Sequence, residues 1–164
     1  MRLLGLSAGT IRDLADGRAV LVDGVEVTWP EHDRRVLGYR RHALTLDPGA
    51  APYLLHVLLD DATVAGRIGC HEGPQDGTVE IGYAVSPEYR GHGVATAMVR
   101  EFVDWLAGQG VRTVRASVSP ENAASRALLD RFGFVEVGSH LDDEDGPELE
   151  LELHISGSGP VAAR

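Results

Sequence analysis

The nine residues PEYRGHGVA occupy positions 87–95, between an apolar run and an amphipathic stretch that begins at Val94. Glycine has no Cβ, so Gly91 and Gly93 allow the backbone to turn tightly here. The first N–H groups of a helix have no partner within it and, with the helix dipole, attract an anion. Arg90, just before the glycines, adds a positive charge. The stretch therefore predicts a phosphate-binding loop at the start of a helix.

Three kinds of phosphate-binding loop can be compared with this stretch. A Walker loop ends in Gly-Lys-Ser/Thr, whereas Gly93 is followed by Val94. A dinucleotide-binding loop needs a third Gly or Ala, and an acidic residue on the next strand, which residues 112–118 do not supply. An acyl-CoA loop of the form Arg-x-x-Gly-x-Gly/Ala fits Arg90, Gly93 and Ala95. A plain strand-to-helix turn that uses glycine only for its geometry is the remaining alternative.

Length and composition limit the class of protein. A chain of 164 residues predicts one domain, placed at residues 1–155, with a small, polar and flexible tail at 156–164. Cys70 is the single cysteine, which excludes an intrachain disulfide and favours a cytoplasmic location. Neither a membrane span nor a signal peptide is expected from the apolar runs. The net charge of −10 argues against a nucleic-acid partner and favours a cationic one.

Apolar residues recur along the chain with two spacings, one typical of helices and one typical of strands. Val94, Met98, Phe102 and Leu106 recur every four residues and predict a helix that ends near Gly108. Residues 148–155 alternate Glu or His with Leu or Ile, which predicts a half-buried strand whose outward acidic row discourages edge pairing. The other expected strands are 3–6, a broken piece at 21–27, 53–59, 64–71, 78–85 and 113–118, and the other expected helices are 9–15, one from Pro30 to about Asp47, and one capped by Asn122 or by Pro120-Glu121. This order predicts an α+β fold with a sheet of mixed direction.

Two further segments surround the loop in the sequence. Residues 78–85 read TVEIGYAV, and residues 119–134 read SPENAASRALLDRFGF. Together with the loop, these segments resemble the core motifs of the GCN5-related N-acetyltransferases (GNAT). The spacing of Asn122, Ser125 and Gly133 looks most like the branch that contains the ribosomal-protein N-terminal acetyltransferases.

The resemblance covers residues 55–137 and implies a fold and a cofactor. The implied GNAT fold has a mixed, mostly antiparallel central sheet that is splayed in the middle and flanked by about four helices. The implied co-substrate is acetyl-CoA, whose pantetheine lies between strands 78–85 and 113–118. Seven histidines without ligand spacing predict no metal. The implied cofactor contacts are Ala84, Val85, Arg90, Gly91, His92, Gly93, Val94, Ala95, Asn122 and Ser125, and the backbone N–H of Ala84 or Val85 would hold the oxyanion.

Acetyl transfer to an amine needs a base, because amine pKa values lie between about 8 and about 10.4. Glu80 is the predicted base, since it lies on the strand before the loop and several relatives carry a carboxylate there. The alternative is that Glu80 is a solvated member of an alternating strand face. His71, which titrates near neutrality when exposed, and Glu72 are reserve candidates.

The departing thiolate needs a donor, and here the sequence departs from the family pattern. Many relatives carry a tyrosine at the position of Leu129, which has no proton to donate. Ser125 matches a serine proposed for this duty in the ribosomal-protein branch and is the predicted catalytic partner of Glu80. Tyr83 is an alternative donor. The predicted acceptor contacts are Trp29, Tyr39, His71 and Tyr83. Core packing is the alternative for Trp29 and Tyr39, and a plain surface position is the alternative for His71.

The motifs together predict an acetyl-CoA-dependent N-acetyltransferase. The acceptor is a primary amine, either a protein N-terminus or a small amine, that attacks directly in a ternary complex. A non-catalytic acyl-CoA sensor is the alternative, which Leu129 favours. No nucleic-acid or membrane partner is expected, and the resemblance allows a homodimer. Cys70 has no His/Asp partner and is expected to pack in the core.

Overall fold

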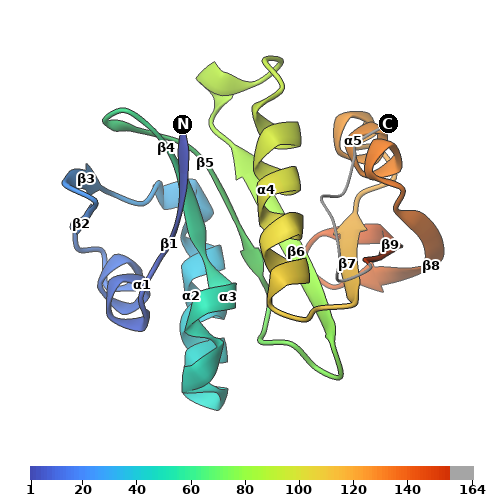
Figure 1. Ribbon diagram of the computed structural model, residues 1–164, viewed down its shortest axis with the longest axis horizontal. Helices are drawn as coiled ribbons and strands as arrows, with labels where there is room; N and C mark the ends of the chain where they lie inside the picture. Colours follow the sequence, from blue (N-terminus) through green and yellow to red (C-terminus); the bar gives the residue numbers. More distant parts are fainter. Residues whose placement is uncertain (156–164) are drawn as a thin grey trace.

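The computed structural model describes residues 1–155, apart from the side chain of His32. A seven-stranded sheet runs in the order β1-β4-β5-β6-β7-β9-β8, and β2 and β3 form a separate hairpin (Figure 1). The strands are β1 (Arg2–Gly5), β2 (Val20–Val22), β3 (Val25–Val27), β4 (His56–Asp60), β5 (Thr63–Cys70), β6 (Thr78–Val85), β7 (Thr113–Val118), β8 (Val135–Asp142) and β9 (Gly146–His154). The helices are α1 (Ala8–Ala15), α2 (Arg34–Leu46), α3 (Ala51–Leu54), α4 (Val94–Gly108) and α5 (Ala123–Phe132). Within residues 1–155 only β6 and β7 pair in parallel, so the predicted α+β fold with a mostly antiparallel sheet is confirmed.

Local rules explain most element boundaries. The side chain of Ser7 accepts a hydrogen bond from the Thr10 N–H and so caps α1. Asp23 and Gly24 both have positive φ and form the turn of the β2–β3 hairpin. Gly133 ends α5 in the left-handed conformation. The helix at 9–15, the broken piece at 21–27 and the helix after Asn122 were all predicted from the sequence.

Two predictions about elements were wrong, and a third holds except for the first turn of its helix. Residues 53–55 do not belong to a strand, because Pro48 and Pro52 start successive helical turns that end in α3. The helix expected from Pro30 begins as a 3₁₀ turn, Glu31–Asp33, and becomes α2 at Arg34. β9 is not an edge strand, because β8, which was not predicted, pairs along it. The predicted tail of residues 156–164 lies outside the described residues.

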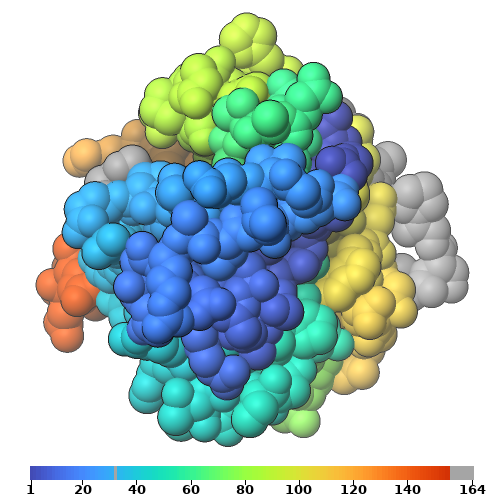
Figure 2. Space-filling model, turned by 90° about the vertical axis from the view of Figure 1, so that its left-hand side faces the viewer, coloured from blue at the N-terminus to red at the C-terminus, as the bar shows by residue number. Residues whose placement is uncertain are grey.

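Helices cover both faces of the sheet. Alternate residues of β4 divide between two hydrophobic clusters. Leu58 belongs to the cluster that includes residues of α4 and α5, whereas Val57 and Leu59 belong to the one that includes residues of α1 and α2. Figure 2 shows the N-terminal helices in blue and cyan, with α4 in yellow at their right and the end of the β8–β9 hairpin in orange-red at their left. No helix within residues 1–155 is both long enough and apolar enough to cross a membrane.

The sheet opens between β6 and β7. These strands pair only at residues 78–80 and 113–115. Beyond that point β6 pairs with β5 alone, and β7 with β9 alone. The predicted splaying of the sheet is therefore confirmed, and it leaves one edge of each strand free along residues 81–85 and 116–118.

Candidate active site

Two cavities meet where the sheet opens. A cavity of about 360 Å³ is lined by β6, β7 and the first turns of α5. A larger one of about 1110 Å³ is lined by α2, β6, β7, β8 and β9. Six residues line both cavities, namely Ile81, Gly82, Ala116, Ser117, Asp145 and Glu148. The opening therefore connects the α5 side of the sheet with its α2 side.

Glu80, the predicted base, lies in the larger cavity with two neighbours. The Ser117 hydroxyl on β7 donates a hydrogen bond of 2.9 Å to Glu80 Oε1. His71 follows β5 directly, and its Nδ1 lies 3.7 Å from the same oxygen. The backbone N–H of His71 also donates to the Glu80 carbonyl oxygen at 2.8 Å. The structure thus brings together the predicted base and its reserve, and it adds Ser117, which sequence reasoning missed.

The surroundings of His71 favour the neutral form of its imidazole. Desolvation in the cavity lowers its pKa, and the buried Arg40 guanidinium lowers it further, against the opposing charges of Glu80 and Glu72. A Cβ on Gly82 would lie 3.1 Å from His71 Nε2, so the ring covers the backbone of β6 at this glycine. A neutral ring beside a carboxylate can accept or pass on a proton.

Tyr83 and Ser125 meet in the smaller cavity. Their hydroxyl oxygens lie 2.6 Å apart and share a hydrogen bond. The Ser125 N–H donates to Asn122 Oδ1 at 3.1 Å, which fixes both residues at the start of α5. Leu129, buried one turn later, lines the same cavity. Burial raises the pKa of Tyr83, and the hydrogen bond with Ser125 opposes that shift.

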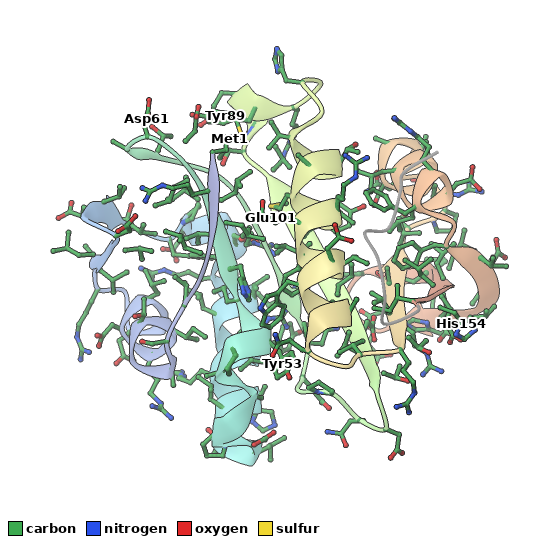
Figure 3. The ribbon with its side chains drawn as sticks, viewed as in Figure 1. Met1, Tyr53, Asp61, Tyr89, Glu101 and His154 are labelled. Carbon is green, nitrogen blue, oxygen red and sulfur yellow. The ribbon has the colours of Figure 1, made fainter. Side chains whose placement is uncertain are left out.

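The predicted phosphate loop adopts the expected backbone. Gly91 and Gly93 have φ of 76° and 77°, and a Cβ on either would meet no atom within 4 Å. No side chain caps α4. The first hydrogen bond of the helix is donated by the Ala97 N–H to the Gly93 carbonyl, so the amides from Val94 up to that point have no partner within the helix. Figure 3 shows Tyr89, just before the loop, at the end of the molecule where α4 begins.

The other predicted contacts of the loop are placed as follows. Arg90 is exposed and donates from Nε to the Val85 carbonyl at 3.1 Å, so it joins the loop to the end of β6. His92 is exposed. Ala84 and Val85 lie on the half of β6 that has no partner on the β7 side. Within residues 1–155, no group of three or more His, Cys, Asp or Glu is arranged to hold a metal ion.

The predicted acceptor contacts are not all in one place. Tyr39 on α2 lines the larger cavity, and its hydroxyl donates to Glu144 at 2.6 Å. Arg35 on the same helix donates to both oxygens of Asp145 at 2.8 Å, so α2 holds the tip of the β8–β9 hairpin. Trp29 lines neither cavity: its Nε1 donates to the Asp33 carbonyl, and the Arg67 guanidinium lies over its ring. The structure therefore separates Trp29 from Tyr39, His71 and Tyr83.

Sequence reasoning misplaced the acidic row of β9. Its Glu residues were expected to face solvent at an edge, but they form one wall of the larger cavity. Desolvation raises the pKa of Glu148; His140 opposes this shift, and neighbouring carboxylates add to it. Eight carboxylates line this cavity against three arginines: Glu72, Glu80, Asp142, Glu144, Asp145, Glu148, Glu150 and Glu152 against Arg35, Arg40 and Arg115. Such a wall attracts cations.

Parts of the sequence are similar to those of named acetyltransferases. Over 87 residues the chain is 29% identical to N-alpha-acetyltransferase 30 of Schizosaccharomyces pombe, covering 51% of this chain and 58% of that protein. It is 32% identical over 87 residues to YdaF of Bacillus subtilis, provisionally named a ribosomal N-acetyltransferase, covering 52% of this chain and 48% of that one. The chain thus spans about half the length of these relatives.

A solved structure extends the likeness to the whole fold. The ribosomal-protein-S18-alanine N-acetyltransferase of Escherichia coli superposes with a TM-score of 0.66 at 20% identity, over 96% of both chains. The ribosomal-protein branch, to which the motifs were compared, thus has a member among the sequence relatives, and the superposition confirms the predicted GNAT fold. Residues 17–134 match the sequence profile of the Acetyltransferase (GNAT) family, and the chain belongs to this family.

Proposed function

We propose that this protein transfers an acetyl group from acetyl-CoA to a primary amine by direct attack in a ternary complex. One observation carries the proposal: the sheet opens between β6 and β7, and the opening joins a cavity that holds Glu80 to one that holds Tyr83 and Ser125. An acyl donor and an amine can therefore approach the same stretch of β6 from different sides.

The residues present fit coenzyme A. The uncapped amides at the start of α4 and the open space at Gly91 and Gly93 suit a diphosphate. The free edge of β6, with the N–H groups of Ala84 or Val85, suits an extended chain of amides and a developing negative charge on oxygen. Asn122 and Ser125 would line the far side. When bound, acetyl-CoA supplies the acyl group as a thioester.

Glu80 is the base in this proposal. It takes a proton from the amine, directly or through a water molecule, while the Ser117 hydroxyl holds its carboxylate in place. His71 lies beside Glu80 and would pass the proton on or contact the acceptor. The acidic wall of the larger cavity favours a cationic acceptor, because carboxylates outnumber arginines there. Both a protein N-terminus and a small amine satisfy this requirement.

Calorimetry tests the cofactor first. Acetyl-CoA and free CoA should both release or absorb heat on binding, and no heat from either at high protein concentration would end the proposal. Thiol release above background with any amine of a panel of peptides, polyamines and amino acids would then support the enzyme. Because Leu129 stands where many relatives have a proton donor, an acyl-CoA sensor is the alternative function. Tight CoA binding without turnover across the whole panel would favour the sensor.

Glu80→Gln tests the base. We expect kcat to fall about 100-fold near neutral pH, and the loss to shrink as pH rises, because the amine then loses its proton without help. Glu101→Gln is the matched control, since Glu101 is exposed on α4 and lines neither cavity (Figure 3). An equal loss at every pH would remove Glu80 from the proton transfer.

A further inference from the structure

We propose that the Tyr83 hydroxyl, held by Ser125, donates the hydrogen bond that stabilises the leaving sulfur of coenzyme A. This inference rests on the proposed function. In many relatives a tyrosine on α5 is the donor to the leaving sulfur. Leu129 occupies that position here and has no proton to donate, so the inference places the donor on β6.

The two faces of β6 separate the base from this donor. Side chains alternate along a strand, and Glu80 lies toward the larger cavity on the α2 side. Tyr83 packs against the cluster formed with α4 and α5, and it lines only the smaller cavity. An amine that enters beside Glu80 reaches the acyl carbon from the α2 side. The sulfur, on the other side of that carbon, then departs toward Tyr83.

The smaller cavity offers few other donors. Four hydroxyl groups line it, from Tyr83, Ser117, Ser119 and Ser125. Ser117 already donates to Glu80, and the Ser119 hydroxyl lies at the turn before α5, where it accepts from the Glu121 N–H and keeps its own proton. Tyr83 and Ser125 differ from both because they are joined to each other, with their oxygens 2.6 Å apart. Once a sulfur lies beside Tyr83, Ser125 donates to the phenol oxygen and the phenol donates to the sulfur.

The ordinary pKa values of a thiol and a phenol favour a hydrogen bond from Tyr83 to the sulfur over a full proton transfer. Glu80 passes the first amine proton to solvent before the attack. The new N–C bond then forms and the C–S bond breaks, so the bonding electron pair leaves on sulfur while the second nitrogen proton goes to Glu80. A thiol has an ordinary pKa of about 8.5 and a phenol one of about 10, so transfer from Tyr83 would be uphill by about 1.5 units. Tyr83 therefore keeps its proton, and the thiolate takes one from water after release.

Binding of free CoA isolates this contact from turnover. The probes are CoA and desulfo-CoA, which lacks the sulfur, measured by calorimetry at about pH 8.5, where roughly half of an ordinary thiol is ionised. The unaltered protein should bind CoA about tenfold more tightly than desulfo-CoA, because hydrogen bonds to charged groups are strong. Tyr83→Phe should remove most of that preference and leave the affinity for desulfo-CoA unchanged.

Tyr53→Phe is the matched control. Tyr53 packs against Trp105 with ring centroids 5.4 Å apart, and it lies by the end of α4 opposite to Tyr89 (Figure 3). It lines neither cavity, so the preference for CoA should persist. A preference that survives Tyr83→Phe, or that the unaltered protein lacks, overturns the inference while leaving the proposed function intact. No binding of CoA at all ends both.

Ser125 is the positioning residue, and a second pair of variants tests it. Ser125→Ala should reduce the preference for CoA, whereas Ser125→Thr keeps a hydroxyl and should restore it. Once an acceptor amine has been identified, Tyr83→Phe should lower kcat about 10- to 100-fold with little change in the KM of the amine. A change confined to KM would place Tyr83 in acceptor binding and overturn the assignment.

Discussion

Lowering the pH from 7 to 4 should destabilise this protein by about 3 kcal/mol through one residue, His56. The imidazole is 8% exposed, and it lies 4.9 Å from the Phe102 ring and 5.0 Å from the Trp105 ring, centroid to centroid. Its Nδ1 has no hydrogen-bond partner within residues 1–155. A proton would place an unsolvated charge between α4 and β4, so burial lowers the pKa of His56 to about 4.

The magnitude follows from the difference between the folded and unfolded chains. The pKa falls from the ordinary 6.5 to about 4 on folding, and each unit corresponds to about 1.4 kcal/mol. The unfolded chain binds a proton at His56 below about pH 6.5, whereas the folded chain resists it until about pH 4. Stability is therefore lost as pH falls through this window. About 2 kcal/mol should be gone at pH 5, and the loss levels off below pH 4.

Urea unfolding at a series of pH values checks this prediction. Carboxylates also titrate below pH 5, so the quantity to plot is the difference in unfolding free energy between the unaltered protein and His56→Phe. Phenylalanine keeps a ring among Phe102 and Trp105 and cannot titrate. His92→Gln is the control, because His92 is exposed. A difference that stays constant from pH 7 to pH 4 would refute the reasoning.

Two further predictions concern packing around β5. Cys70 is fully buried and burial raises its pKa to about 12, so a thiol reagent should label the native protein no faster than it unfolds; rapid stoichiometric labelling would show that the site opens. Gly69→Ala should destabilise the protein by about 1–3 kcal/mol in urea unfolding, because the new Cβ would lie 2.0 Å from the Leu54 carbonyl oxygen and backbone must shift. Gly108→Ala meets nothing within 4 Å and should not destabilise, and equal effects of the two substitutions would contradict this explanation.

The parts of the site that sequence reasoning placed correctly are those that local rules determine. Glycines with positive φ mark the loop before α4, and Asn122 marks the start of α5 by capping it. β6 and β7 have the predicted bounds, since turn residues and alternation delimit them. The pairing of Tyr83 with Ser125 needed the third dimension, because 42 residues separate the two hydroxyl groups.

β8 shows why the remaining part could not be predicted. Val135, Val137 and Leu141 are all more than half exposed, so no buried face gives this strand a recognisable pattern. Its pairing with β9 defines it instead, across an irregularity between Glu136 and Gly138. Without β8, the acidic strand looks like an edge.

The presence of β8 also changes the role of the acidic residues of β9. Alternation along β9 was predicted correctly, since Leu151 and Leu153 are buried. Alternation distinguishes two faces of a strand but does not say what lies opposite the polar face. Here α2 lies opposite, joined to the hairpin tip through Arg35, and the glutamates become a cavity wall in place of a solvated edge. Because a cavity wall excludes part of the water that would screen these charges, they attract a cationic amine more strongly than the same residues on an open edge would.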